Sequence, residues 1–117
     1  MSIQRFEKNG KRLSHVLVHN GVAYVTGQVP TDRTQDIAGQ TKQLLDRMDH
    51  LLEVAGTDKS KILFAQIWLK NITRDFAAMN QAWESWIPEE ALPARATVEA
   101  NMAAEEILIE IALQAAV

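Results

Sequence analysis

The sequence contains no cysteine. This absence excludes a disulfide framework, a thiol nucleophile and any zinc or iron–sulfur site built on thiolates. No stretch of the chain approaches the roughly 18 consecutive apolar residues that a membrane-spanning helix needs, so we expect no contact with a membrane. The first eight residues contain no apolar segment, which argues against a signal peptide and leads us to expect a cytoplasmic protein.

Positive charge is also scarce. Twelve basic residues stand against fifteen acidic ones, which gives a net charge of −3. Because nothing in this balance attracts a phosphate backbone, we expect no nucleic-acid partner. The 117 residues, 47% hydrophobic and 23% charged, have the composition of an ordinary globular protein and are too few for two cores. We therefore expect a single domain over residues 1–117.

The spacing of the apolar residues alternates between the period of a strand and the period of a helix. The resulting order, β-β-α-β-α-β-β, predicts an α+β fold in which both helices pack on one face of a mixed sheet. The predicted strands cover residues 13–19, 22–26, 61–69, 94–101 and 107–113, and the predicted helices cover 37–55 and 74–87.

Turn and cap residues mark several boundaries. Asn20-Gly21 predicts a tight hairpin turn, because both residues tolerate a positive φ. Polar residues before each helix can accept hydrogen bonds from its first N–H groups, and a glycine suits the position just after a helix. The candidates are Thr34 or Asp36 before the first helix, Gly56 after it, and Thr73 or Asp75 at the start of the second.

The predicted strand over residues 61–69 is largely apolar on both faces. One face should meet the helices. A chain with only two helices has little left to cover the other face, which indicates a partner subunit.

Arg95 and Glu110 are the residues that best suggest chemistry. If the last two strands form a hairpin that turns near Met102-Ala103, the two side chains lie opposite each other, with Cβ atoms about 5 Å apart. One interpretation is a structural salt bridge, and the pattern alone favours it. In the other, Arg95 binds a ligand carboxylate with its planar guanidinium, while Glu110 handles a proton or a water molecule.

Other chemistry-bearing residues have simpler explanations. His15 and His19 are four residues apart on one strand, but no acidic residue at suitable spacing completes a metal site, so surface or interface histidines are favoured. The three tryptophans are spaced as core residues rather than as a stacking platform for bases.

Several segments resemble the Rid/YjgF family of reactive-intermediate (enamine/imine) deaminases. The most specific is Pro93-Ala94-Arg95-Ala96-Thr97-Val98-Glu99 followed by Ile109-Glu110-Ile111. The resemblance covers nearly the whole chain. The other segments that carry it are Tyr24-Val25-Thr26-Gly27-Gln28-Val29-Pro30, Gln40-Thr41 and Asp75-Phe76-Ala77-Ala78-Met79-Asn80.

The resemblance implies a chorismate-mutase-like domain that assembles as a homotrimeric barrel, with active sites between subunits. It implies hydrolysis of 2-aminoacrylate, 2-iminopropanoate and related 2-imino acids to the 2-oxo acid and ammonia, without a metal or an organic cofactor. By position, Arg95 binds the substrate carboxylate and Glu110 positions the attacking water. Gly27 and Thr97 contact the substrate through their main chains, and Asn80 supports the site.

The chain departs from the family pattern at a few positions. Many members have a tyrosine near the start of the first strand, where this chain has Arg12-Leu13-Ser14 with Leu13 nearest by count, and a cysteine where Thr97 stands. The resemblance therefore does not extend to the shape of the pocket or to the preferred imine. Two other functions stay open. One is a related hydrolase or deaminase in a catabolic pathway, and the other is a non-catalytic trimeric module that binds small carboxylates or a protein partner. Net charge and the lack of a basic cluster argue against the nuclease and translation-inhibitor roles also attached to this family.

Overall fold

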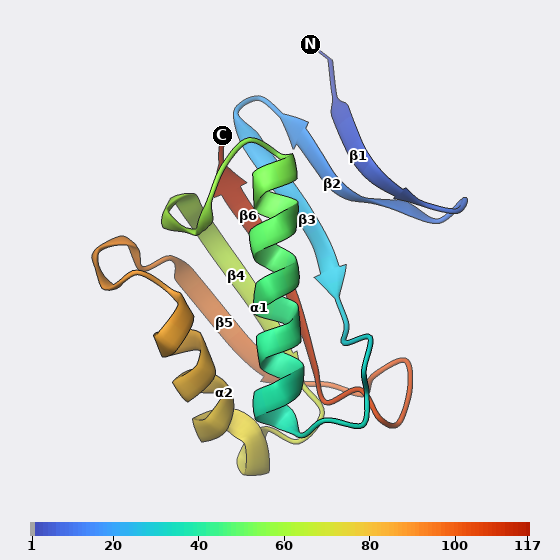
Figure 1. The fold of residues 1–117 in the computed structure, drawn as a ribbon, viewed down its shortest axis with the longest axis vertical. Helices are drawn as coiled ribbons and strands as arrows, with labels where there is room; N and C mark the ends of the chain where they lie inside the picture. Colours follow the sequence, from blue (N-terminus) through green and yellow to red (C-terminus); the bar gives the residue numbers. More distant parts are fainter. Residues whose placement is uncertain (1) are drawn as a thin grey trace.

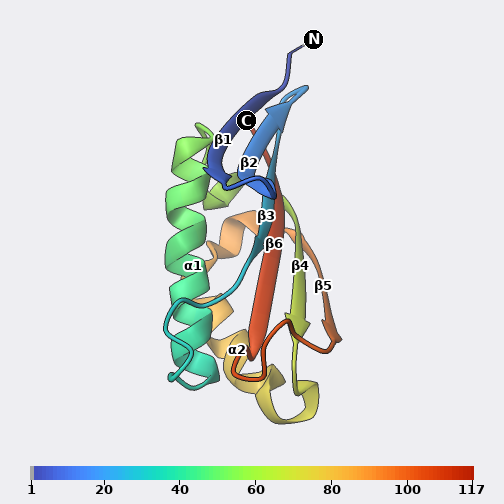
Figure 2. The ribbon, with the colours of Figure 1, turned by 90° about the vertical axis from the view of Figure 1, so that its right-hand side faces the viewer.

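The computed structural model describes residues 2–117 as two layers, a six-stranded sheet and two helices that cover one of its faces (Figures 1 and 2). This confirms the α+β architecture and the mixed sheet. The elements are β1 (Gln4–Asn9), β2 (Leu13–His19), β3 (Val22–Gln28), α1 (Ile37–Val54), β4 (Ile62–Leu69), α2 (Ile72–Trp86), β5 (Ala94–Glu99) and β6 (Ile109–Ala116), with single 3-10 turns at Lys59–Lys61 and Glu89–Ala91.

The strands lie in the order β1-β2-β3-β6-β4-β5. Only β4 and β5 are parallel, because α2 carries the chain back across the helix-covered face between them. Strand β1 was not predicted. Its single apolar residue is Phe6, and such a polar edge strand has almost no alternation to detect.

The tight turn between β2 and β3 is confirmed. Asn20 and Gly21 have φ angles of 52° and 76°, and they join the paired residues His19 and Val22. These dihedral angles belong to the turn whose twist matches that of the flanking strands. The turn therefore fixes the register of β3, on which Gly27 lies.

The helix boundaries confirm some predicted caps and correct others. The Asp36 carboxylate accepts a 3.0 Å hydrogen bond from the N–H of Gly39 at the start of α1, and Gly56, with φ of 84°, follows its end. Helix α2 begins two residues earlier than predicted, so neither Thr73 nor Asp75 caps it. Asn71 does, since its Oδ1 accepts a 2.9 Å hydrogen bond from the N–H of Arg74.

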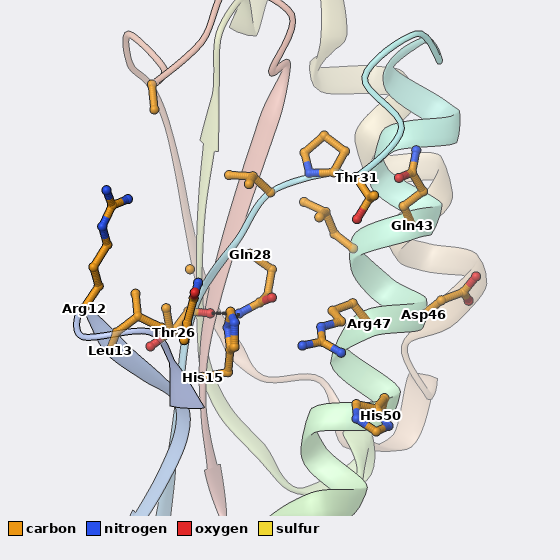
Figure 3. Close-up of a pocket in the computed structure, with 16 residues that line it drawn as sticks. Arg12, Leu13, His15, Thr26, Gln28, Thr31, Gln43, Asp46, Arg47 and His50 are labelled. Atoms are coloured by element: carbon orange, nitrogen blue, oxygen red, sulfur yellow. Dashed lines mark hydrogen bonds between the residues drawn. The ribbon is translucent and has the colours of Figure 1, made fainter. Parts of the chain in front are cut away.

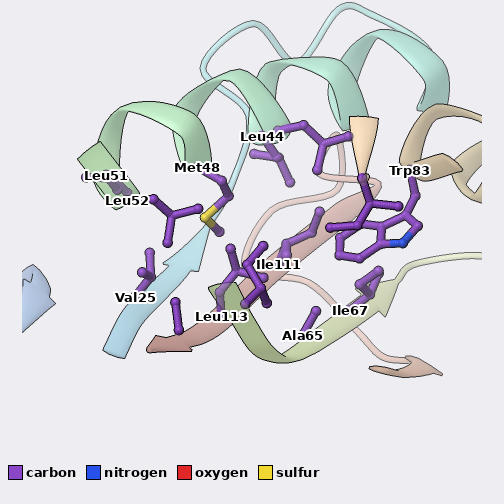
Figure 4. Packing of buried hydrophobic residues seen from close by; sticks show 14 of the residues in the cluster. Val25, Leu44, Met48, Leu51, Leu52, Ala65, Ile67, Trp83, Ile111 and Leu113 are labelled. Atoms are coloured by element: carbon purple, nitrogen blue, oxygen red, sulfur yellow. The ribbon is translucent and has the colours of Figure 1, made fainter. Parts of the chain in front are cut away.

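The hydrophobic core fills the space between the sheet and the helices (Figure 4). Sheet residues that point toward the helices are almost fully buried, and so is Trp83 of α2, at 5% exposure. Burying large aliphatic side chains of this kind stabilises the fold by roughly 2 kcal/mol each. The central contributors are Val25, Leu44, Met48, Leu51, Leu52, Ala65, Ile67, Met79, Ile111 and Leu113.

The other face of the sheet has no covering layer in the described part of the chain (Figure 2). Strand β4 turns Phe64, Gln66 and Trp68 toward this open face, where they are half-buried. Leu63 and Tyr24 are 49% and 41% exposed. The sheet therefore has the expected apolar face that no helix covers.

The predicted hairpin of the last two strands is wrong. Strand β6 pairs with β3 and β4, while β5 pairs only with β4, at the edge of the sheet. The connection from β5 to β6 passes the end of β4, whose exit residue Lys70 donates its N–H to the carbonyl of Leu108 at 3.0 Å. Arg95 and Glu110 consequently never face each other across a strand pair.

Candidate active site

Arg95 lies on the helix-covered face of β5, against α2. Its Nη2 donates a 2.6 Å hydrogen bond to Oδ1 of Asn80, and its guanidinium carbon lies 5.5 Å from the centre of the Trp83 ring. Asn80 and Trp83 are three residues apart on α2 and so share one surface of the helix. Together they hold the guanidinium in place: the Trp83 ring lies under the cation, and the Asn80 oxygen accepts a hydrogen bond from one of its nitrogens.

Most of the hydrogen-bonding capacity of Arg95 is unused. A guanidinium has five N–H donors. Within residues 2–117, only one nitrogen of the Arg95 guanidinium donates a side-chain hydrogen bond, and the group forms no ion pair. Burial lowers the pKa of Arg95, an effect that the nearby Glu84 carboxylate opposes. The guanidinium borders a hollow of about 290 Å³ lined by Asn80, Trp83, Glu84, Ile87, Leu92 and Pro93. A carboxylate of a small ligand is the group that such a half-buried fork binds best.

Glu110 lies against Gly27 on β3. A Cβ atom added at Gly27 would overlap Oε2 of Glu110, so only glycine leaves room for the carboxylate there. The side chain is half-buried, and residues 2–117 offer it no hydrogen bond or ion pair. Burial raises the pKa of Glu110 because the ionised form loses hydration.

Buried Gln40 fixes the start of β6. Its Nε2 donates to the carbonyl of Glu106 at 3.0 Å, and its Oε1 accepts from the N–H of Leu108 at 2.9 Å. Both bonds hold the loop that leads into Glu110 against the first turns of α1. This explains how an element far away in sequence positions the carboxylate.

Arg95 and Glu110 lie on opposite faces of the sheet. Arg95 is paired with Ala65 of β4, whose side chain is buried under the helices. Glu110 is paired with Trp68, three residues further along the same strand, and successive residues of a strand point to opposite faces. One chain therefore carries two half-sites: Arg95 with Asn80, and Glu110 with Gly27.

Thr97 belongs to the half-site of Arg95. It lies two residues after Arg95 on the same face of β5, and its neighbours across a shallow hollow are Ile72, Thr73 and Phe76 of α2. Its Oγ1 is buried and has no hydrogen-bond partner in the described residues. A buried hydroxyl without a hydrogen bond lowers the stability of the fold. The Thr97 hydroxyl is therefore available to hydrogen-bond a ligand or a water molecule.

A large groove runs past Gly27 between β2, the segment after β3 and helix α1, and no sequence pattern predicted it (Figure 3). Its volume is about 970 Å³. Arg12 and Leu13 lie on one side of the strands in this view, and Arg47 and His50 on the helix side. On the strand side of the groove, Nδ1 of His15 forms a 3.0 Å hydrogen bond with Nε2 of Gln28.

The family model described as Endoribonuclease L-PSP matches residues 4–117. The chain belongs to the Rid/YjgF family. A RutC family protein of Haemophilus influenzae is 44% identical over 114 residues, which cover 97% of each chain. The 3-aminoacrylate deaminase RutC of Acinetobacter baylyi is 34% identical over 99 residues, covering 80% of this chain and 77% of the relative.

Solved structures of Rid/YjgF proteins share the fold closely. A YjgF family member from Neisseria meningitidis has a TM-score of 0.94 at 35% identity and covers 99% of this chain and 95% of its own. A protein from Salmonella typhimurium, described as a putative translation initiation inhibitor, has a TM-score of 0.89 at 37% identity and covers 99% and 98%. The shared fold and the shared sequence both support the Rid/YjgF assignment. Neither helix of the described residues combines the length and the hydrophobicity that a membrane span requires.

Proposed function

We propose that this protein hydrolyses 2-imino and enamine acids, of the 2-aminoacrylate and 2-iminopropanoate type, to the 2-oxo acid and ammonia. The observation that carries the proposal is Arg95, which is anchored by Asn80 and Trp83 but keeps most of its donors free. A bidentate contact there would orient a small 2-imino acid by its carboxylate. Membership in the Rid/YjgF family supports the same reaction, and the Acinetobacter relative is named for a deamination of an enamine acid.

The reaction needs a water molecule and one group that moves protons. Water adds through its oxygen to C2 of the imine, and Glu110 accepts the proton that the water releases. Glu110 passes this proton to the imine nitrogen, which gives the neutral carbinolamine and returns Glu110 to its ionised form. Glu110 then takes the hydroxyl proton of the carbinolamine and delivers it to the same nitrogen, so that the C–N bond breaks, ammonia leaves and the C2 oxygen becomes the carbonyl of the 2-oxo acid. One water is consumed and one ammonia is released for each imine.

Because the two half-sites lie on opposite faces of one sheet, we propose that a complete site forms between subunits of a homotrimer. Arg95, Asn80 and Thr97 of one copy would face Gly27 and Glu110 of the next. The open apolar face with Leu63 and Tyr24 supports assembly, because an isolated chain would leave it in water.

Sedimentation equilibrium at micromolar concentration tests the assembly. We expect a mass about three times the 13.1 kDa of the chain. A monomer at that concentration would leave the half-sites separated and would count against both the assembly and the mechanism.

An assay of ammonia release tests the reaction itself. Freshly generated 2-iminopropanoate should lose ammonia faster with the purified protein than in buffer, and 3-aminoacrylate serves as the second enamine substrate. The alternative is a trimeric module that only binds small carboxylates, for which Arg95 with Asn80 would suffice. That module would bind 2-oxo acids and leave the hydrolysis rate of both substrates at its buffer value.

Replacing Gly27 by alanine should lower turnover without unfolding the protein. The new Cβ would displace the Glu110 carboxylate, the flexible end of a side chain, and a misplaced catalytic group costs about tenfold or more in rate. Turnover and the melting temperature would be measured on the same sample. If Gly27 acts through Glu110, the substitution should add little to the loss already caused by Glu110→Gln, and additive losses would contradict this role.

A further inference from the structure

Arg12 lines the groove that passes Gly27. It follows the turn between β1 and β2, where Gly10 has a φ of 55° and the N–H of Arg12 donates to the carbonyl of Asn9 at 3.1 Å. The turn therefore fixes the backbone of Arg12, which lines the groove and lies across the strands from Arg47 in Figure 3. Leu13 lies next to it and gives the same flank an apolar surface.

Arg47 and His50, on the helix side of the groove, already have an acidic partner. Glu7 lies 3.9 Å from Nη2 of Arg47 and 3.3 Å from Nε2 of His50. Arg12, by contrast, has no ion pair with any residue from 2 to 117. Of the two arginines that line the groove, Arg12 is thus the one available to a ligand.

Gly27 connects this groove with the half-site of Glu110. It lines the groove together with Arg12, and the position that its missing Cβ would occupy is filled by the Glu110 carboxylate. A ligand whose reacting carbon sits over Gly27 therefore has Glu110 on one side and the groove with Arg12 on another. This placement differs from that of Arg95, which belongs to β5 and α2.

We propose that Arg12 binds a second acidic group of the substrate, so that the preferred substrates are 2-imino acids with an acidic side chain, of the 2-iminobutanedioate or 2-iminopentanedioate type. This inference rests on the proposed function, in which Arg95 holds the first carboxylate. The methylene groups between the two carboxylates would lie along Leu13. Arg12 also offsets the repulsion between a second carboxylate and the negative charge of Glu110.

Two stable 2-oxo acids of equal chain length test the proposal. 2-Oxopentanedioate and 2-oxopentanoate differ only in the terminal carboxylate, and their dissociation constants would be measured by calorimetric titration of the assembled protein. The dicarboxylate should bind about tenfold more tightly, a modest gain because Arg12 is exposed to solvent. Arg12→Gln should abolish the difference and leave 2-oxopentanoate binding unchanged. Lys11→Gln removes the same charge from the same turn outside the groove, and it should preserve the difference.

The possible outcomes separate this inference from the function on which it rests. Equal binding of the two acids, with both lost in Arg95→Ala, would overturn the role of Arg12 and leave the deaminase proposal standing. Equal weakening of both acids by Arg12→Gln would also overturn it, since Arg12 would then act through Glu110 or the fold. Failure of both acids to bind the unchanged protein would overturn the two proposals together.

Discussion

Replacement of Arg95 by alanine should lower kcat/KM for 2-iminopropanoate by about a hundredfold or more, as expected when a half-buried, charge-assisted contact to the substrate is lost. Arg95→Lys keeps the charge but loses the planar fork, the bond to Asn80 and the position over Trp83. It should therefore recover only part of the activity. Steady-state kinetics on the three proteins give the comparison.

Arg5→Ala is the matched control for this experiment. It removes one positive charge from an exposed position on β1 and should leave kinetics and melting temperature nearly unchanged. A near-normal rate in Arg95→Ala would reject the deaminase and favour another function for the assembled protein. A large fall in melting temperature with normal kinetics would mean that Arg95 serves the fold through Asn80 and Trp83.

Replacement of Glu110 by glutamine should lower kcat by about a hundredfold or more while 2-oxo acid binding stays nearly intact, because the amide keeps the shape but cannot accept a proton. The pH dependence provides a second readout. Burial raises the pKa of Glu110, so the acid limb of the rate profile should lie above the pH range of an ordinary glutamate and should disappear in Glu110→Gln. An unchanged acid limb in the variant would assign that ionisation to another group.

The same pKa shift fixes the sign of a stability effect. A carboxyl with a higher pKa in the folded state binds its proton more tightly there, so ionisation costs stability as the pH rises from the ordinary carboxyl range through the raised pKa. Below that window the group has no effect, and above it the cost is constant. Glu110→Gln should therefore match or slightly exceed the unchanged protein in melting temperature at neutral pH. A clear loss of stability there would indicate a structural role for the ionised carboxylate.

Local sequence signals predicted most of the elements but not the neighbourhood of the charged residues. Asn20-Gly21 and Gly56 mark their turns because backbone dihedral angles depend on adjacent residues. The alternation in β5 also placed Arg95 and Thr97 correctly on one face. The order of the strands in the sheet could not be predicted in the same way, because it depends on contacts between distant segments. A hairpin is only one way to place two consecutive strands.

The insertion of β4 between β5 and β6 changed the predicted relation of Arg95 to Glu110 completely. Each residue was assigned to the right strand, yet pairing with β4 puts the two side chains on opposite faces. Family resemblance supplied the idea of sites between subunits, which stays a prediction. The groove at Arg12 could not be predicted from local sequence patterns, because its walls come from two strands, a loop and a helix.

Trp83 performs two tasks with one ring. The indole is 5% exposed and seals the core between α2 and the sheet, and the same ring lies 5.5 Å from the guanidinium carbon of Arg95. An aliphatic residue could fill part of this volume but would offer the cation no aromatic face, and a smaller residue would also leave a cavity. The mutational tolerance of position 83 is therefore the overlap of two separate requirements. A substitution at this position therefore acts on Arg95 as well as on the core, through one side chain.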